Sequence, residues 1–244
     1  MSTLVTQYDS LVAKIVARRT ALATAEDNLT TFLGRPLKGG PDVSQWQGSI
    51  DQPAIAAQGY EFILYKASEG LTIKDSMLSS VRVDLTRAAG LTMGFYHFAR
   101  PQPGRTGRQE AQWFLNCVRS VGGFVPGDLV PVLDIEWSRG LTATQVRDWC
   151  SDFCKTMRDE LGRGCITYTG HFWNDFVRLP APEQGGTLWN AHYTDAAEPR
   201  PIIGFPRWTF WQFTQTGSIR GIPTECDINR FNGTVEDFLG LLLK

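Results

Sequence analysis

Residues 130–137 read Val-Pro-Val-Leu-Asp-Ile-Glu-Trp, an apolar run that ends in two carboxylates two positions apart, Asp134 and Glu136. The run predicts a buried strand, in which side chains at i and i+2 share a face with α-carbons about 6.6 Å apart. Two like charges held this close raise one pKa and leave the other low. The pair therefore indicates either acid–base chemistry or two structural acids at a strand end.

Around this strand the sequence alternates between strand and helix patterns from residue 40 onward. Strand character is found at 39–43, 61–66, 92–98, 129–136, 164–168, 187–192, 209–214 and 225–229. Helical character is found at 52–58, 75–89, 106–120, 142–161, 171–178 and 234–243. Repeated strand-then-helix units favour parallel strands with helices packed outside. We expect an α/β fold, an irregular (β/α)8-type barrel with about eight strands and fewer helices in its last third.

The first 34 residues follow a different pattern, with apolar side chains at alternating steps of four and three. The stripe consists of Leu4, Tyr8, Leu11, Ile15, Arg18, Leu22, Ala25, Leu29 and Phe32, of which Arg18 is charged and Ala25 small. This spacing predicts an amphipathic heptad helix over 1–34, followed by a Gly- and Pro-rich linker at 35–40 and a catalytic barrel at 41–244. A lone solvated helix gains little stability, so we expect it to dock on its own barrel by default, with self-association or another partner as the alternatives.

Composition excludes several classes of function. Lys plus Arg number 24 and Asp plus Glu 25, so the net charge of −1 gives no basic field for nucleic acid. The five Cys form neither a paired C-x-x-C signature nor an even set, which argues against a zinc site and a disulfide framework and favours synthesis in a reducing cytoplasm. We expect no membrane span and no signal peptide, since Asp9, Lys14, Arg18 and Arg19 interrupt any apolar leader.

Two more acids fall on the first and last expected strands, Asp42 and Asp227. Reactive groups of such barrels lie at the C-terminal ends of the strands, and the first and last strands of a closed barrel are neighbours. We therefore expect Asp42 and Asp227 to approach each other across the barrel mouth from Asp134 and Glu136. Each acid alone could equally be a turn or strand-end residue.

Eight segments carry a family resemblance in the order in which they occur here. They are Asp42–Gly48, Tyr65–Gly70, Gly94–Phe98, Leu133–Glu136, Tyr168–Gly170, Leu188–Tyr193, Trp211–Thr214 and Asp227–Asn229. With these segments the chain resembles the family 25 glycoside hydrolases, the Chalaropsis-type lysozymes of phage endolysins and bacterial autolysins. The resemblance covers roughly residues 40–232 and leaves out the N-terminal helix.

The resemblance implies hydrolysis of the β-1,4 bond between N-acetylmuramic acid and N-acetylglucosamine in peptidoglycan, without a metal or other cofactor. It implies that Glu136 is the general acid and that Asp134 stabilises the developing positive charge or orients the substrate's acetamido group. Asp42 and Asp227 match the remaining acids of the family's cleft. The family also favours retention of configuration, through a covalent intermediate or with the substrate's N-acetyl group as nucleophile.

Aromatic rings are expected to stack on the sugars of such a substrate. The candidates near strand ends in the matching segments, together with one acid of the second segment, are Tyr65, Glu69, Tyr96, Tyr168, Trp189, Tyr193 and Trp211. Any ring that points outward from its strand would instead belong to the core. His97 alternates with Tyr96, cannot share its face, and is expected to be structural.

Two other functions remain open at this point. The first is a chitinase-like N-acetylglucosaminide hydrolase, although the longer series of acids expected of that family is absent. The second is a non-catalytic wall-binding or virion structural component. The expected setting is a phage lysin, made in the host cytoplasm without a signal peptide or carried in a particle, that acts on the bacterial cell wall.

Overall fold

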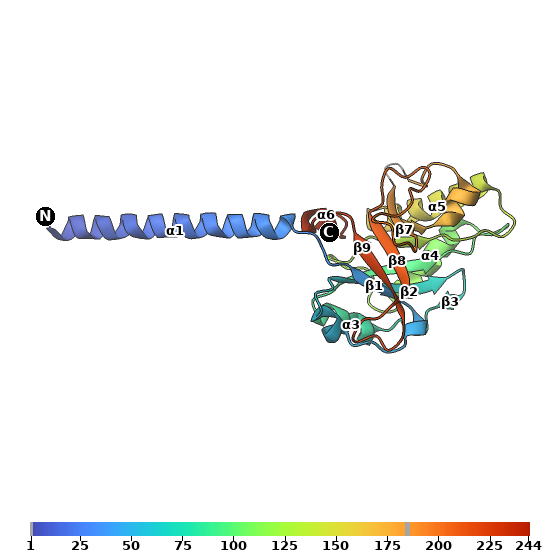
Figure 1. The fold of residues 1–244 in the computed structure, drawn as a ribbon, viewed down its shortest axis with the longest axis horizontal. Coiled ribbons are helices and arrows are strands. Elements are labelled where there is room, and N and C mark those ends of the chain that lie inside the picture. Colours follow the sequence, from blue (N-terminus) through green and yellow to red (C-terminus); the bar gives the residue numbers. More distant parts are fainter. Residues whose placement is uncertain (1, 184–185) are drawn as a thin grey trace.

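The protein forms a closed barrel with a long helix at its N-terminus (Figure 1). The computed structural model describes residues 2–183 and 186–244. Eight strands close the barrel in the order β1-β9-β8-β7-β6-β5-β4-β2, and β1 pairs with β2 to complete the ring. The ninth strand, β3, pairs only with β2 and lies outside the ring. The prediction of an irregular eight-stranded α/β barrel is confirmed.

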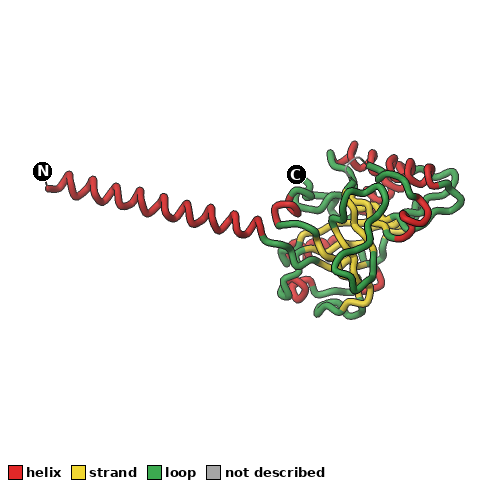
Figure 2. Tube along the Cα trace, turned by 45° about the horizontal axis from the view of Figure 1, so that its top comes forward, coloured by secondary structure: helices red, strands yellow, loops and turns green. Residues whose placement is uncertain are grey.

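The strands are short and most are buried. Their bounds are β1 Gly40–Val43, β2 Phe62–Glu69, β3 Ile73–Lys74, β4 Thr92–Phe98, β5 Val132–Asp134, β6 Ile166–Thr169, β7 Thr187–Ala191, β8 Phe210–Gly217 and β9 Cys226–Phe231. The helices are α1 Ser2–Gly34, η1 Gln45–Gln47, α2 Gln52–Ala56, α3 Ser80–Ala88, α4 Gly107–Arg119, α5 Ala143–Leu161, η2 Trp173–Val177 and α6 Val235–Leu239. The strands form the centre of the barrel domain, and helices and loops surround them (Figure 2).

One strand of the ring differs from the expected parallel pattern. Strand β9 runs antiparallel to both β8 and β1, because a short connection without a helix joins it to β8. Its first residues therefore lie at the same end of the barrel as the last residues of the parallel strands. This reversal brings Asp227, the second residue of β9, to the mouth.

Alternation along the strands separates two cores. Inward-facing residues fill the barrel, among them Leu64, Val132, Ile166 and Phe210. Their neighbours along the chain point outward and pack under the helices, as Ile63 and Leu133 do. Helices α4 and α5 each begin with a capping box, Thr106 with Gln109 and Thr142 with Gln145, which fixes where each helix starts.

Helix α1 projects away from the barrel, and its root lies beside α6 (Figure 1). The expectation that it docks on its own barrel is wrong. The linker after it is nonetheless attached to the barrel, because Pro36 bridges to Thr234 and the Lys38 N–H donates to Glu61. Among the described residues no helix is long and apolar enough to cross a membrane.

Candidate active site

The mouth of the barrel brings the four predicted acids together. Strands β1 and β9 pair so that Asp42 lies directly opposite Asp227. Across from them, Asp134 is the last residue of β5 and Glu136 follows two residues later. Asp134 is buried, whereas Glu136 is exposed. All four carboxyls line one cavity of about 300 Å³, which we call the acid pocket.

Two buried amides hold Asp42 in place. Its Oδ2 accepts from Nε2 of Gln212 at 2.8 Å and from Nδ2 of Asn229 at 2.8 Å. Three ring donors fix these amides in turn: the Tyr168 and Tyr193 hydroxyls donate to Oε1 of Gln212 at 2.8 and 2.7 Å, and the Trp189 indole donates to Oδ1 of Asn229 at 2.7 Å. The network links three predicted aromatic residues to one acid.

Burial among like charges changes the pKa of every acid in the cavity. Burial raises the pKa of Asp42, although its two amide donors oppose the shift. Burial and the neighbouring Asp42 raise the pKa of Asp227 from 3.8 to about 8. Glu136 reaches solvent, yet desolvation by the surrounding cavity walls raises its pKa. Burial together with Glu136 raises the pKa of Asp134 well above its usual range. The cavity therefore retains protons at neutral pH, as a general acid requires.

A second cavity lies on the other side of Glu136. It has a volume of about 290 Å³ and shares Glu136, Tyr168 and Tyr193 with the acid pocket. Its walls are mainly apolar, and we call it the apolar pocket. Its remaining lining residues are Gly170, His171, Phe172, Asn190, Ala191, His192, Arg200 and Ile202.

Of the predicted sugar-contacting residues, four line a cavity: Tyr96, Tyr168, Trp189 and Tyr193. Tyr65 does not, because it points outward from β2, where its hydroxyl bonds Thr86 at 2.7 Å. Trp211 also points outward, and its indole donates to the His192 carbonyl at 2.7 Å. Both predictions of sugar contact are wrong, because each ring lies one position out of phase with the inward-facing residues of its strand.

Glu69 is also absent from both cavity walls. It forms ion pairs with Lys66, at 2.7 Å, and with Arg100, and these partners lower its pKa against the effect of burial. It therefore positions Lys66, which does line the acid pocket. His97 is structural, as expected: it is fully buried and bonds Ser68 at 2.8 Å and Glu110 at 2.9 Å.

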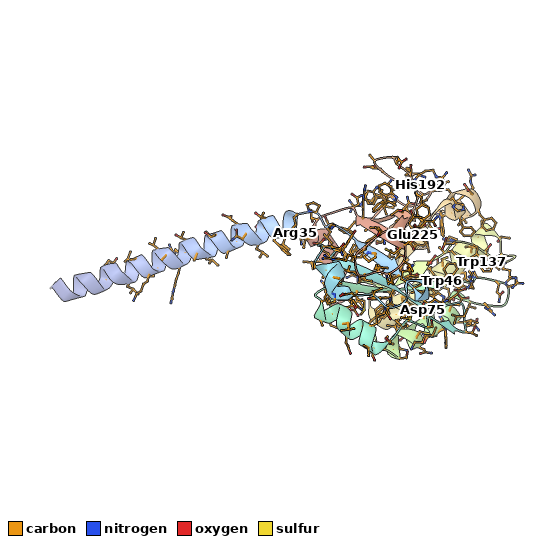
Figure 3. All side chains as sticks on the ribbon, turned by 60° about the horizontal axis from the view of Figure 1, so that its bottom comes forward. Arg35, Trp46, Asp75, Trp137, His192 and Glu225 are labelled. Atoms are coloured by element: carbon orange, nitrogen blue, oxygen red, sulfur yellow. The ribbon has the colours of Figure 1, made fainter. Side chains whose placement is uncertain are left out.

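Sequence reasoning missed several cavity residues. Trp46 lies at the rim of the acid pocket with 76% of its surface exposed, and Lys66, Phe98 and Gln212 also line that cavity. Figure 3 shows Trp46 on the barrel, far from helix α1, whose root is marked by Arg35. Strand alternation could have found Lys66 and Gln212, since each follows an outward-facing aromatic residue.

Within residues 2–183 and 186–244, no group of three or more His, Cys, Asp and Glu side chains is arranged to hold a metal ion. All five Cys are free and buried.

A family model described as glycosyl hydrolases family 25 matches residues 41–222. The chain belongs to glycoside hydrolase family 25. It is 36% identical over 214 residues to lysozyme M1 of Streptomyces globisporus, covering 83% of this chain and 70% of that one. The bacterial lysozyme of Streptomyces coelicolor has a similar structure, with a TM-score of 0.77, 34% identity and coverage of 85% and 97%. The CTP1L endolysin is more distant, with a TM-score of 0.67, 25% identity and coverage of 84% and 70%.

Membership of family 25 identifies the protein as a glycoside hydrolase with lysozyme (muramidase) activity. The match covers the barrel from β1 to the connection that precedes β9. It leaves out α1 and also β9, so the family model covers most of the cleft without Asp227 and does not account for the projecting helix.

Proposed function

We propose that Glu136 is the general acid that cleaves the β-1,4 bond between N-acetylmuramic acid and N-acetylglucosamine in peptidoglycan. The observation that carries this assignment is its position: it is the exposed member of the strand-end pair, and it lies between two cavities. Its proton passes to the glycosidic oxygen as the bond from that oxygen to the anomeric carbon breaks. A water later adds to the anomeric carbon and returns a proton to Glu136.

With the proton of the pair on Glu136, Asp134 is ionised and supports the positive charge that develops on the sugar. It is buried beside Glu136, and its Oδ1 has no hydrogen-bond partner among the described residues. An unpaired buried carboxylate oxygen is unfavourable unless a group of the substrate interacts with it. The sugar's ring carbon or its acetamido N–H would serve. Asp42 adds negative charge that helps to keep the proton on Glu136, and Asp42 and Asp227 contact the same sugar.

The test is the loss of turbidity of purified bacterial walls, with chitin as a second substrate. We expect Glu136→Gln to lower the rate at least about 1,000-fold while the melting temperature stays within a few degrees, because it removes only the transferable proton. Glu160→Gln, on the exposed face of α5, is the matched control. Equal wall lysis by wild type and Glu136→Gln would refute the assignment. Cleavage of chitin in preference to walls would indicate a chitinase-like enzyme, and inertness of the wild type a binding protein.

We further propose that the reaction retains the anomeric configuration, with Asp134 holding either the sugar or its acetamido group. NMR of a defined glycan digest identifies the first-formed anomer. A first product of inverted configuration would eliminate this route.

We also propose that α1 pairs with α1 of a second copy in antiparallel orientation. Its apolar stripe is solvent-exposed at Tyr8, Leu11, Ile15, Leu22, Leu29 and Phe32. In a parallel pair the two Arg18 side chains would share one layer. An antiparallel pair that sets residues 14–19 of each helix opposite residues 24–29 of the other separates the two Arg18 side chains and brings the basic stretch towards the acidic residues 26–27.

The solution mass of the full chain tests this pairing. We expect a dimer for the wild type, a monomer for Leu22→Asp on the stripe, and a dimer for Thr20→Asp on the opposite face. A wild-type monomer at micromolar concentration would refute the pairing. Wall lysis by the barrel should be retained in both variants, since neither residue is near the cleft.

We propose, finally, that the enzyme is a phage lysin, an inference supported by the similarity to the CTP1L endolysin. The test is the effect of inducing the chain in bacteria, alone and together with a membrane-permeabilising protein. Lysis that needs the second protein is expected. Lysis on induction of the chain alone would contradict a dependence on a separate membrane lesion.

A further inference from the structure

The two cavities on either side of Glu136 divide the substrate, if Glu136 is the general acid proposed above. A proton donor at a glycosidic oxygen lies between the two sugars that the oxygen joins. The acid pocket contains Asp42, Asp134 and Asp227, which face developing positive charge, so it holds the sugar whose anomeric carbon reacts. The apolar pocket then holds the leaving sugar, N-acetylglucosamine.

The apolar pocket contains one buried acceptor that nothing satisfies. Asn190, on β7, is 1% exposed, and its Nδ2 donates to the Arg200 carbonyl at 2.8 Å. This bond orients the amide, and Oδ1 of Asn190 has no partner among the described residues. An unpaired buried acceptor is unfavourable, so the geometry favours a ligand that brings an N–H or O–H donor.

The other walls indicate what accompanies that donor. Phe172, Ala191 and Ile202 give the pocket apolar surface, which fits a methyl group rather than a hydroxyl-rich sugar face. An acetamido group has both features, an amide N–H and a methyl group about two bonds away from it. The leaving sugar carries this group at carbon 2.

The remaining lining groups disfavour a sugar that carries a free amine, instead of an acetamido group, at carbon 2. Without its acetyl group, glucosamine has a primary amine that is cationic near neutral pH. Arg200, whose side chain is always charged, lines the same pocket. A cationic amine would meet this positive charge and would leave the apolar walls without a methyl group.

We propose that the apolar pocket binds the acetamido group of the leaving N-acetylglucosamine and so discriminates against glycan strands whose glucosamine units are de-N-acetylated. Asn190 accepts from the amide N–H, Ile202 and Phe172 contact the methyl group, and Arg200 repels a free amine. The apolar pocket is then the site at which the muramidase distinguishes acetylated from de-N-acetylated glucosamine.

The test compares kcat/KM on two wall preparations from one strain, one fully N-acetylated and one de-N-acetylated at glucosamine. A site built to pair a polar group rejects an analogue that lacks it by a large factor, and we expect the wild type to prefer acetylated walls by roughly 100-fold. Asn190→Ala should reduce this ratio at least about 10-fold, mainly through slower cleavage of acetylated walls. Arg200→Gln, an exposed and therefore foldable change, should reduce it through faster cleavage of de-N-acetylated walls.

Arg207→Gln, which changes an exposed arginine outside the apolar pocket, is the matched control and should leave the ratio unchanged. Equal cleavage of both walls by the wild type would overturn the proposal, as would an Arg200→Gln ratio equal to that of Arg207→Gln. Failure to cleave either wall would instead refute the proposed function. The two failures are therefore distinguishable.

Discussion

Asp227→Asn should stabilise the protein at neutral and alkaline pH, because the wild type holds this acid beside Asp42. The folded-state pKa of Asp227 is about 8, against 3.8 for the free side chain. A raised folded-state pKa means that the native state binds the proton more tightly than the unfolded chain does. The stability that this proton contributes is complete below about pH 4 and is lost as the pH rises from about 4 to about 8.

The magnitude follows from the size of the shift. About four pKa units at about 1.4 kcal/mol per unit give an upper limit of about 6 kcal/mol. Asp227 is only partly buried and shares the shift with Asp42, so we expect the loss to be about 2–3 kcal/mol. An amide cannot ionise and escapes this loss. For a chain of this size, the melting temperature of Asp227→Asn at pH 8 should exceed that of the wild type by about 4–12 °C.

Thermal unfolding of both proteins between pH 4 and pH 8 is the assay. The difference in melting temperature should be close to zero at pH 4 and grow steadily towards pH 8. Asp195→Asn, which changes an exposed acid, should show no such trend. A constant difference across the pH range, or a variant less stable than the wild type at pH 8, would refute this account of the four acids.

Three further predictions concern single contacts. Gln212→Leu removes a hydrogen-bond donor to Asp42 and leaves the hydroxyls of Tyr168 and Tyr193 unpaired. The free energy of unfolding, measured in urea, should therefore fall by about 2–4 kcal/mol, and an unchanged value would contradict the network. Trp46→Ala should raise KM for walls about 2- to 10-fold through lost stacking while the melting temperature stays within about 2 °C, and an unchanged KM would remove Trp46 from the substrate path. Glu110→Leu unpairs the buried His97 ring and the Arg100 N–H, and calorimetry should show a loss of about 2–4 kcal/mol that exposed Asp159→Asn lacks.

The placement of the acids could be predicted from sequence because strand geometry is local. Asp134 and Glu136 are two residues apart, so alternation alone places them on one face. The expected approach of Asp42 to Asp227 is also confirmed, since closure of a barrel makes the first and last strands neighbours. The reason why Asp227 reaches the mouth was not predicted, because nothing in residues 225–229 states the direction of the strand.

The aromatic residues show where local patterns fail. Tyr65 and Trp211 lie in segments as well matched as those of Tyr96 and Trp189, yet they point into the outer layer. Whether a side chain points into the barrel or out of it depends on the register in which its strand joins the ring. A shift of the register by one residue turns every inward-facing side chain of the strand outward. Trp46 lies in η1 rather than in a strand, so no periodic pattern could mark it as a cavity residue.

The sequence by itself determined the class of barrel, the heptad stripe of the N-terminal helix and the four acids, because periodicity and spacing are properties of neighbouring residues. Only the tertiary structure decided that α1 leaves the barrel surface, that Gln212 and Asn229 hold Asp42, and that Glu136 separates two cavities. Each of these depends on residues tens to nearly two hundred positions apart, and their proximity arises only when the ring of strands closes.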